Sequence, residues 1–299
     1  MSKKSILLFP YTQKNGYNKT ATCSVRIYSW QEKFIRRRRE KRLAKSEKKL
    51  PFLEEQRNED GRMKKEQKRK ITQLLWYGIA GAVLTMIGDF LLLGVDSTGA
   101  EGAVSQYLMA AEKISYTRIG LAGFFGFVGI PVTAFGYYAL YQMMEDRKSA
   151  AARWYKASVY GYVAFGGAIH IICCYLVTGM KKALETGTES GDILAMILKE
   201  QGGYLIPCFV VFFAFYLINV IMLIYIIAKK KTPLPGWMWI LNPLLFKILI
   251  NGFGKLGTSA FFNGTACANM SLGALIILVA WMIVIRKRDY EDFVTIRKK

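Results

Sequence analysis

The sequence is poor in acidic residues and in the residue types that most catalytic and metal sites use. Its 299 residues include 21 Asp plus Glu against 42 Lys plus Arg, and a single histidine, His170. One histidine excludes a multi-histidine metal centre. Phosphate-loop, zinc-protease, nucleophile-elbow and dinucleotide-binding motifs are also missing from the sequence. We therefore expect no metal, no cofactor and no catalytic residue, and an enzyme is the less favoured class.

Cysteine is scarce as well. Five cysteines, an odd number, stand at Cys23, Cys173, Cys174, Cys208 and Cys267, and none forms a Cys-x-x-Cys pair. The two adjacent cysteines point to different faces of a helix, so they cannot build a redox or zinc motif. Small apolar packing residues are the favoured interpretation. The pattern excludes a disulfide-rich secreted domain.

Hydrophobic residues and positive charge occupy different parts of the chain. Hydrophobic residues make up 53% of the sequence, whereas residues 1–70 carry 22 basic and 8 acidic residues. The positive charge is thus concentrated in an N-terminal tail. Such segregation excludes a wholly disordered chain and an ordinary cytosolic enzyme, and it indicates a membrane domain behind a basic tail.

The apolar part of the chain divides into six candidate membrane spans. A helix that crosses about 30 Å of hydrocarbon at about 1.5 Å per residue needs roughly 20 apolar residues. We predict an all-α fold, a polytopic membrane helix bundle with six transmembrane helices in residues 71–288. The spans are expected at about 74–94, 119–143, 155–179, 204–228, 237–257 and 264–285.

Lys and Arg in the short loops predict the orientation. Basic residues gather at 147–156, 229–231 and 286–288, so these segments are expected inside together with the basic tail. Both termini, including the C-terminal tail 289–299, are then cytoplasmic, and the protein is a multi-pass protein of the cell membrane.

The fifth span is the weakest of the six. It contains Lys247, Asn251 and Lys255, and its glycines could end it early, so a re-entrant segment is the alternative. Pro131 and Pro243 fall inside the second and fifth spans, where a proline can kink a helix.

Glycines in the first two spans form a pattern typical of helix packing. Gly120, Gly123, Gly126 and Gly129 recur every three residues in the second span, and Gly78, Gly81 and Gly88 mark the first span. Small residues allow helix backbones to approach closely in lipid, so we interpret these glycines as packing positions.

The tail 1–70 is expected to be mostly disordered. Its cluster of arginines at 36–39 is interpreted first as a solvated segment that enforces topology, second as a site for anionic lipid; nucleic acid is an unlikely partner. Met63 begins a run that resembles a normal start of a membrane protein. We predict that a chain beginning at Met63 inserts and folds unchanged.

Five polar residues inside the spans define a candidate site for a small ligand or ion. Placed by depth, Asp89, His170 and Asn251 all lie roughly 21 to 23 Å above the cytoplasmic edge at about 1.5 Å per residue. Asn269 reaches nearly the same level from the outside, and Lys247 lies one turn below Asn251. Intramembrane ionisable groups are costly in lipid and mark functional sites.

Two interpretations of this polar layer remain open. In the functional one, Asp89 supplies charge and His170 is its proton partner, with Lys255 and Arg118 as alternative partners for the carboxylate. In the other, the layer is a set of interhelical hydrogen bonds that hold the bundle together.

The end of the first span also carries a short motif. Residues 88–96 read Gly-Asp-Phe-Leu-Leu-Leu-Gly-Val-Asp, and Gly-Ile-Pro follows at 129–131 in the second span. With His170 in the third span and asparagines in the last ones, residues 70–288 resemble an uncharacterised family of bacterial six-helix integral membrane proteins with a Gly-Asp-(Trp/Phe)-Leu-Leu motif. The resemblance implies a bacterial cytoplasmic membrane location and no particular activity.

A transporter or other small-ligand-binding membrane protein is the first function class, since a polar layer within two groups of three spans is typical of it. A membrane sensor or scaffold that uses the basic tail is the second, and an intramembrane enzyme the third. The lipid bilayer is the one partner that every class requires.

Overall fold

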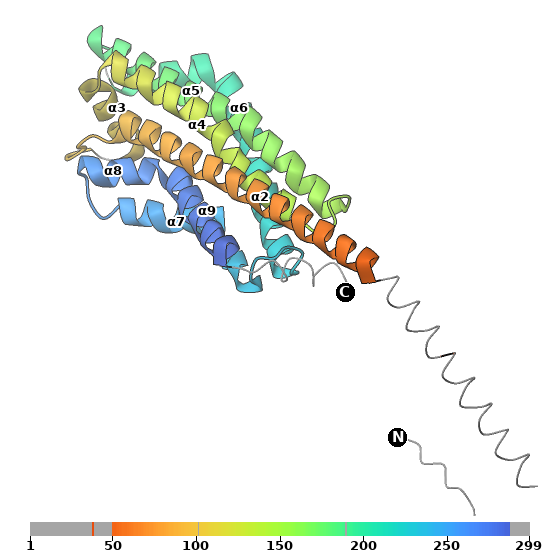
Figure 1. Cartoon of the computed structure of the whole chain (residues 1–299). Coiled ribbons are helices and arrows are strands. Elements are labelled where there is room, and N and C mark those ends of the chain that lie inside the picture. The colour runs from red at the N-terminus through yellow and green to blue at the C-terminus, as the bar shows by residue number, and fades with distance from the viewer. Residues whose placement is uncertain (1–37, 39–49, 101, 189, 288–299) are drawn as a thin grey trace, which may run out of the picture. The chain divides into compact units, whose positions relative to one another are not determined.

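The computed structural model describes residues 38, 50–100, 102–188 and 190–287 (Figure 1). The chain divides into two compact units, Met1–Arg62 and Met63–Lys299. Residues 50–70, which the sequence places in the tail, form the first part of helix α2 (Leu50–Leu93). This stretch is rich in Glu, Lys, Gln and Arg, which favour helix. Apart from residue 38, the rest of the predicted tail lies outside the described residues, as does the C-terminal tail.

All regular structure in the described residues is helical, as predicted. Five helical segments are long and apolar enough to cross a membrane, which supports a multi-pass membrane protein. They are Lys65–Leu93 in α2, α4 (Tyr116–Met143), α5 (Ala150–Glu185), Ile206–Ala228 in α6 (Ser190–Ala228), and α9 (Asn269–Lys287). Shorter elements are α3 (Gly102–Lys113), the 3-10 helix η1 (Gly236–Ile240), α7 (Pro243–Gly254) and α8 (Ala260–Cys267).

The predicted fifth span is not one continuous helix. The segment forms η1 and then α7, whose 12 residues cover only about 18 Å at about 1.5 Å per residue. Pro243 begins α7 instead of kinking a longer helix. Just before it, the buried Asn242 side chain accepts a hydrogen bond from the Leu245 N–H and donates to the Ile240 carbonyl. These bonds satisfy backbone groups that the broken helix leaves free.

The predicted sixth span is interrupted as well. Helix α8 ends at Cys267, Ala268 is a turn residue, and α9 starts at Asn269. The Asn269 side chain donates to the Ala266 carbonyl at this break. Two short polar side chains at the start of α9, Asn269 and Ser271, bond to backbone carbonyls there. Such local side-chain bonds compete with a regular helix, which is why the apolar pattern alone missed the interruption.

Helix α2 packs tightly against α4 through glycines. A Cβ atom added at Gly81 would overlap the Val132–Thr133 backbone, and one added at Gly78 would overlap Gly136. A Cβ at Gly120, the first glycine of the three-residue repeat, would meet nothing within 4 Å. The packing interpretation therefore holds for Gly78 and Gly81 of α2 but does not extend to Gly120.

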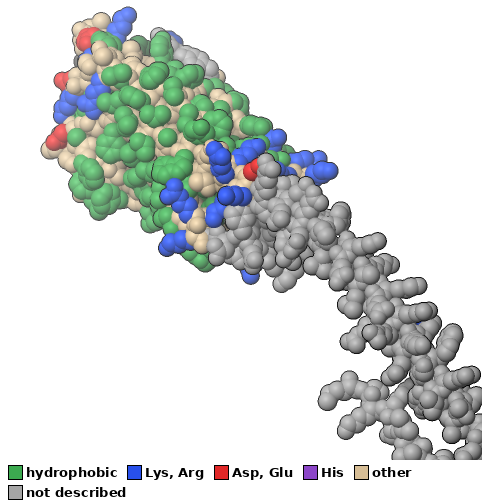
Figure 2. All heavy atoms as spheres, viewed as in Figure 1, with side chains coloured by type: hydrophobic (Ala, Val, Ile, Leu, Met, Phe, Trp, Pro, Cys, Tyr) green, Lys and Arg blue, Asp and Glu red, His purple; other side chains and the backbone are tan. Residues whose placement is uncertain are grey.

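Two clusters of buried apolar side chains lie in the second unit. The first joins α2, α4, α5, α6, η1 and α9 and includes Tyr137, Tyr155 and Trp281; we call it the aromatic core. The second joins the end of α2 to α3, α4, α5 and the start of α6. Figure 2 shows that hydrophobic side chains also cover the middle of the exposed face, with Lys and Arg toward its two ends. An apolar band that faces outward is expected where lipid is the solvent.

Hydrogen bonds show which segments meet at each end of the second unit. At one, which we call the basic end, the Lys68 ammonium donates to the Arg286 carbonyl, and the Glu145 N–H donates to the Lys231 carbonyl. At the other, the distal end, the Ser97 N–H donates to the Thr258 carbonyl. The chain therefore passes from the basic end at Lys231 to the distal end at Thr258, although only part of that passage is α-helical.

Candidate functional site

A cavity of about 250 Å³ is lined by residues from each of the helices α2 to α9, and four of the five predicted site residues line it. Asp89 reaches it from α2, His170 from α5, Lys247 from α7 and Asn269 from α9. Much of the remaining wall is apolar, with Phe209, Phe212 and Phe213 of α6 among its side chains. Charged groups in an apolar surround are costly, so their convergence at one cavity calls for an explanation beyond packing.

Asp89 has two polar partners, one on each carboxylate oxygen. Ser271 Oγ lies 2.6 Å from Asp89 Oδ2, and His170 Nδ1 lies 3.7 Å from Oδ1. The Ser271 hydroxyl also lies 3.1 Å from the Ala268 carbonyl. A hydroxyl has one proton, so Ser271 either donates to an ionised Asp89, or donates to Ala268 while accepting from a protonated Asp89. The geometry accommodates Asp89 in both protonation states. Of the alternative partners, Arg118 donates instead to carbonyls at the end of α2, including Leu91 O.

The orientation of His170 follows from its other ring nitrogen. His170 Nε2 lies 3.0 Å from the Ala122 carbonyl, which can only accept, so Nε2 carries a hydrogen. Nδ1 is then the nitrogen that faces Asp89. Helix α4 makes room for the ring at Gly126, where an added Cβ would overlap the imidazole. Gly126 is therefore a positioning residue for His170.

Lys247 carries the second charge of the cavity. Its Nζ donates to Asn269 Oδ1 at 3.3 Å and lies 5.9 Å from the centre of the Phe213 ring. Both partners are uncharged. Within the described part of the chain, the ammonium makes no ion pair.

A second cavity of about 250 Å³ adjoins the first toward the distal end. Asn251, the fifth predicted residue, lines it together with Asn263. The Asn263 side chain donates to the Val95 carbonyl in the loop that follows α2, residues 94–100, which we call the distal loop. Tyr107 and Asn269 line both cavities. The charged cavity thus continues toward the distal end, and Asn251 lies in this extension and not beside Asp89.

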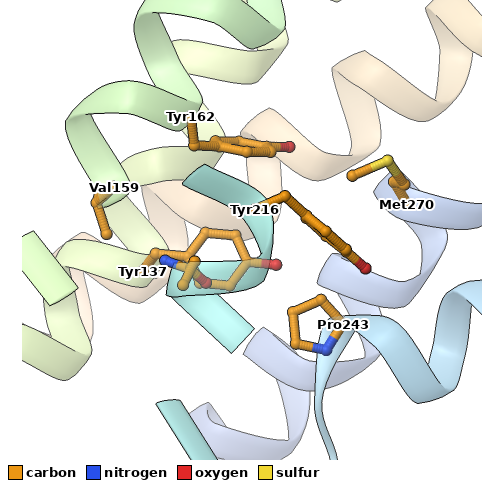
Figure 3. A pocket seen from close by; sticks show the side chains of 7 residues that line it. Tyr137, Val159, Tyr162, Tyr216, Pro243 and Met270 are labelled. Carbon is orange, nitrogen blue, oxygen red and sulfur yellow. The ribbon is translucent and has the colours of Figure 1, made fainter. Parts of the chain in front are cut away.

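A third, much smaller cavity adjoins the charged cavity on the side of the aromatic core (Figure 3). It has a volume of about 10 Å³, close to the space that one water molecule needs. Tyr137, Tyr162 and Tyr216 surround it, with Pro243 and Met270 opposite. Large rings leave little space here, so the cavities narrow toward the basic end.

Several lining residues were not found from the sequence. Ser271 bonds directly to Asp89, and Cys173 and Cys267, interpreted as packing residues, line the cavity. Tyr107 comes from α3, outside every predicted span. Residue type gave no signal for these four, because serine, cysteine and tyrosine are also common in packed helices. In the described residues, no cluster of three or more His, Cys, Asp and Glu side chains could hold a metal ion.

Comparison with known families agrees with the resemblance noted in the sequence. The model of a family of unknown function, DUF6796, matches residues 63–288. The chain belongs to this family. The match begins at the residue where the second compact unit begins, Met63, and it includes every residue of the cavity described above. No curated protein and no solved structure matches the chain.

Proposed function

We propose that this family member is a six-pass protein of the cell membrane, with both termini cytoplasmic, that binds and carries a small ligand or ion in the Asp89–His170–Lys247 cavity. The observation that carries the proposal is the meeting of a carboxylate, an imidazole and an ammonium at one cavity among membrane-compatible helices. Packing alone does not require a cavity of this size beside charged groups.

The six passes are supported by the course of the chain between the two ends. The segments rich in Lys and Arg, around Arg147, Lys231 and Arg286, share the basic end, as the positive-inside rule requires. The fifth pass is then made by η1, the Asn242 cap and α7 together. A topology reporter placed at Lys230 is expected to give a cytoplasmic signal, and an external signal would contradict this orientation.

A cavity-filling substitution tests the binding site. The full chain in detergent is heated with a panel of probes: sodium and potassium chloride, small carboxylates, alkylamines and amino acids. We expect at least one class of probe to raise the unfolding temperature of the wild type, because a ligand that binds the folded state stabilises it. Cys173→Phe places a ring in the cavity and should abolish that response.

The matched control is Cys208→Phe in α6, because Cys208 lines none of the three cavities. It should keep the response of the wild type. A wild type that responds to no probe, or a Cys173→Phe variant that responds normally, would refute the proposed function.

The alternative is a membrane sensor or scaffold in which the basic tail binds anionic lipid. It predicts that a chain beginning at Met63 loses its biological effect while it still inserts. The binding proposal predicts that this shortened chain keeps both membrane accumulation and probe response, since every cavity residue follows Met63.

A further inference from the structure

The charges that surround the cavity indicate the class of its ligand, if the cavity is a binding site as proposed above. Asp89 is surrounded by six titratable side chains that line the same cavity: Tyr107 of α3, Tyr162, His170 and Cys173 of α5, Lys247 of α7, and Cys267 of α8. Unperturbed tyrosine and cysteine side chains are neutral at neutral pH. The charge of the cavity therefore depends on Asp89, His170 and Lys247.

Asp89 and His170 are arranged to share one proton. With Nε2 bonded to the Ala122 carbonyl, Nδ1 faces Asp89 Oδ1 at 3.7 Å. If neither atom carried a proton, an ionised carboxylate would face a lone pair in an apolar surround, which is costly. One proton relieves this, either as imidazolium with carboxylate or as neutral imidazole with carboxylic acid. In both arrangements the pair is neutral overall.

Lys247 then gives the cavity a single net positive charge. Its ammonium donates to the neutral Asn269 amide, and the face of Phe213 supplies only a weak attraction. The first residues of α9, Asn269 to Ser271, also line the cavity, so the positive end of that helix dipole adds to the field. A monovalent anion would neutralise this field, whereas a cation would be repelled by it.

The apolar wall favours an organic anion over an inorganic one. Three phenylalanines of α6 and Leu92 of α2 line the cavity together with the polar groups. Halides and nitrate would gain nothing from these side chains, whereas a short hydrocarbon body would bury apolar surface against them.

We infer that the ligand is a small monocarboxylate with a short apolar body, held by Lys247, and that it binds together with one proton shared by Asp89 and His170. Loss of that proton leaves the cavity with no net charge and removes the attraction for the anion. Binding of the carboxylate therefore takes up a proton from water whenever the pair is not already protonated. Carried together, the two would cross the membrane without net charge.

The test uses formate, acetate, propionate and butyrate as probes, each compared with its amide and with an alkylammonium ion of similar length, at constant ionic strength. The full chain should bind at least one carboxylate and discriminate against both counterparts by at least about tenfold, the scale expected of one charge-assisted contact. Above the pH range where the free pair is protonated, a pH indicator in weakly buffered solution should report close to one proton taken up per bound carboxylate, and below that range it should report none. Above the pH range where the pair is protonated, the affinity should fall by up to about tenfold per pH unit.

Two variants separate the contributions. Lys247→Met should abolish discrimination between carboxylate and amide, whereas Lys255→Met, at the exposed end of α7, should behave as the wild type. Asp89→Asn should abolish the proton uptake that accompanies each bound carboxylate. A purely structural Asp89 would change the unfolding temperature and leave the proton count per bound anion unchanged.

The outcomes distinguish this inference from the proposed function. If alkylammonium ions or halides bind better than every carboxylate, or if a carboxylate binds without proton uptake above the pH range where the free pair is protonated, the inference is overturned while a binding cavity remains. If Cys173→Phe leaves all probe responses intact, the binding cavity itself is refuted.

Discussion

The aromatic core and the charged cavity are neighbours in one helix bundle, yet their polar side chains differ in charge and in hydrogen bonding. In the core, Tyr155 donates to the Tyr137 carbonyl, Ser158 donates to the Tyr155 carbonyl, and Asn219 donates to Ser158. These groups are neutral and bonded to protein. In the cavity, Asp89 and Lys247 carry ionisable groups toward open space and do not pair with each other.

The difference separates a tightly packed part of the bundle from a part that contains cavities. A network of neutral groups that bond to one another suits a closed barrier, because a neutral group needs no ion as a partner. Charged groups that line a cavity suit binding, because a ligand can complete their partners. The aromatic core therefore separates the basic end from the cavity, while the adjoining cavity at Asn251 continues toward the distal end.

The largest effect is expected where α2 meets α4, since this contact holds Asp89 in place. Gly81→Val would push a side chain into the α4 backbone, so it should cost at least about 3 kcal/mol or prevent assembly. Unfolding in mixed micelles measures the cost. Gly120→Val, in open space on α4, is the control and should be near neutral. Equal losses in the two variants would contradict the packing described here.

Truncating the aromatic core should have the next largest effect. Trp281 is fully buried and lies edge-on to Tyr137. Trp281→Ala leaves a large void and should cost about 3 kcal/mol. Trp281→Phe should cost much less, because the indole N–H has no hydrogen-bond partner among the described residues. Trp237→Ala, at an exposed position, is the control for loss of an aromatic ring.

A smaller and more local effect is expected at Gly126. Gly126→Ala places a methyl group against the imidazole of His170, and we expect a loss of about 1 to 3 kcal/mol from overpacking. It should also disturb the proton uptake described above. Gly123→Ala meets only ordinary contacts at 3.5 Å or more, so it should be neutral or slightly stabilising. If Gly123→Ala disturbed proton uptake as much as Gly126→Ala, the positioning role of Gly126 would be refuted.

The smallest effect concerns Asp96 in the distal loop, outside the spans. The Thr98 hydroxyl and the Thr98 backbone N–H both donate hydrogen bonds to the Asp96 carboxylate, and these bonds lower the pKa of Asp96. A lowered folded-state pKa gives stability that is present above the unfolded value of about 3.9 and is lost as the pH falls through the folded value. Thermal unfolding of wild type and Asp96→Asn should therefore differ slightly near neutral pH and converge in acid. A difference in unfolding temperature between the two proteins that became larger in acid would contradict this pH dependence.

The sequence predicted the helical class and brought together most of the candidate site. Depth along the spans placed Asp89, His170 and Asn269 at one level, and all three line one cavity. Depth could not show which helix faces meet, so the contact of Ser271 with Asp89 and the space that Gly126 leaves for His170 were missed.

The sequence marked the fifth span as the weakest, but it did not locate the breaks in the fifth and sixth spans, for a different reason. Mean hydropathy does not distinguish a continuous helix from a short helix with polar caps. At Asn242 and Asn269, a side-chain amide bonds to nearby backbone and replaces the helical bonds that are lost. Such caps depend on backbone geometry, which an apolar pattern does not contain.

Thiol labelling of Cys173 tests the central claim most directly, namely that the charged cavity opens at the distal end and is sealed by the aromatic core. The full chain would keep Cys173 as its single cysteine in a membrane vesicle, and a membrane-impermeant thiol reagent would be added to either side. We predict labelling only from the side that also labels Leu256→Cys at the distal end, and no labelling of a chain that keeps only the buried Cys174. Labelling of Cys173 from the basic side, or from neither side, would contradict the account.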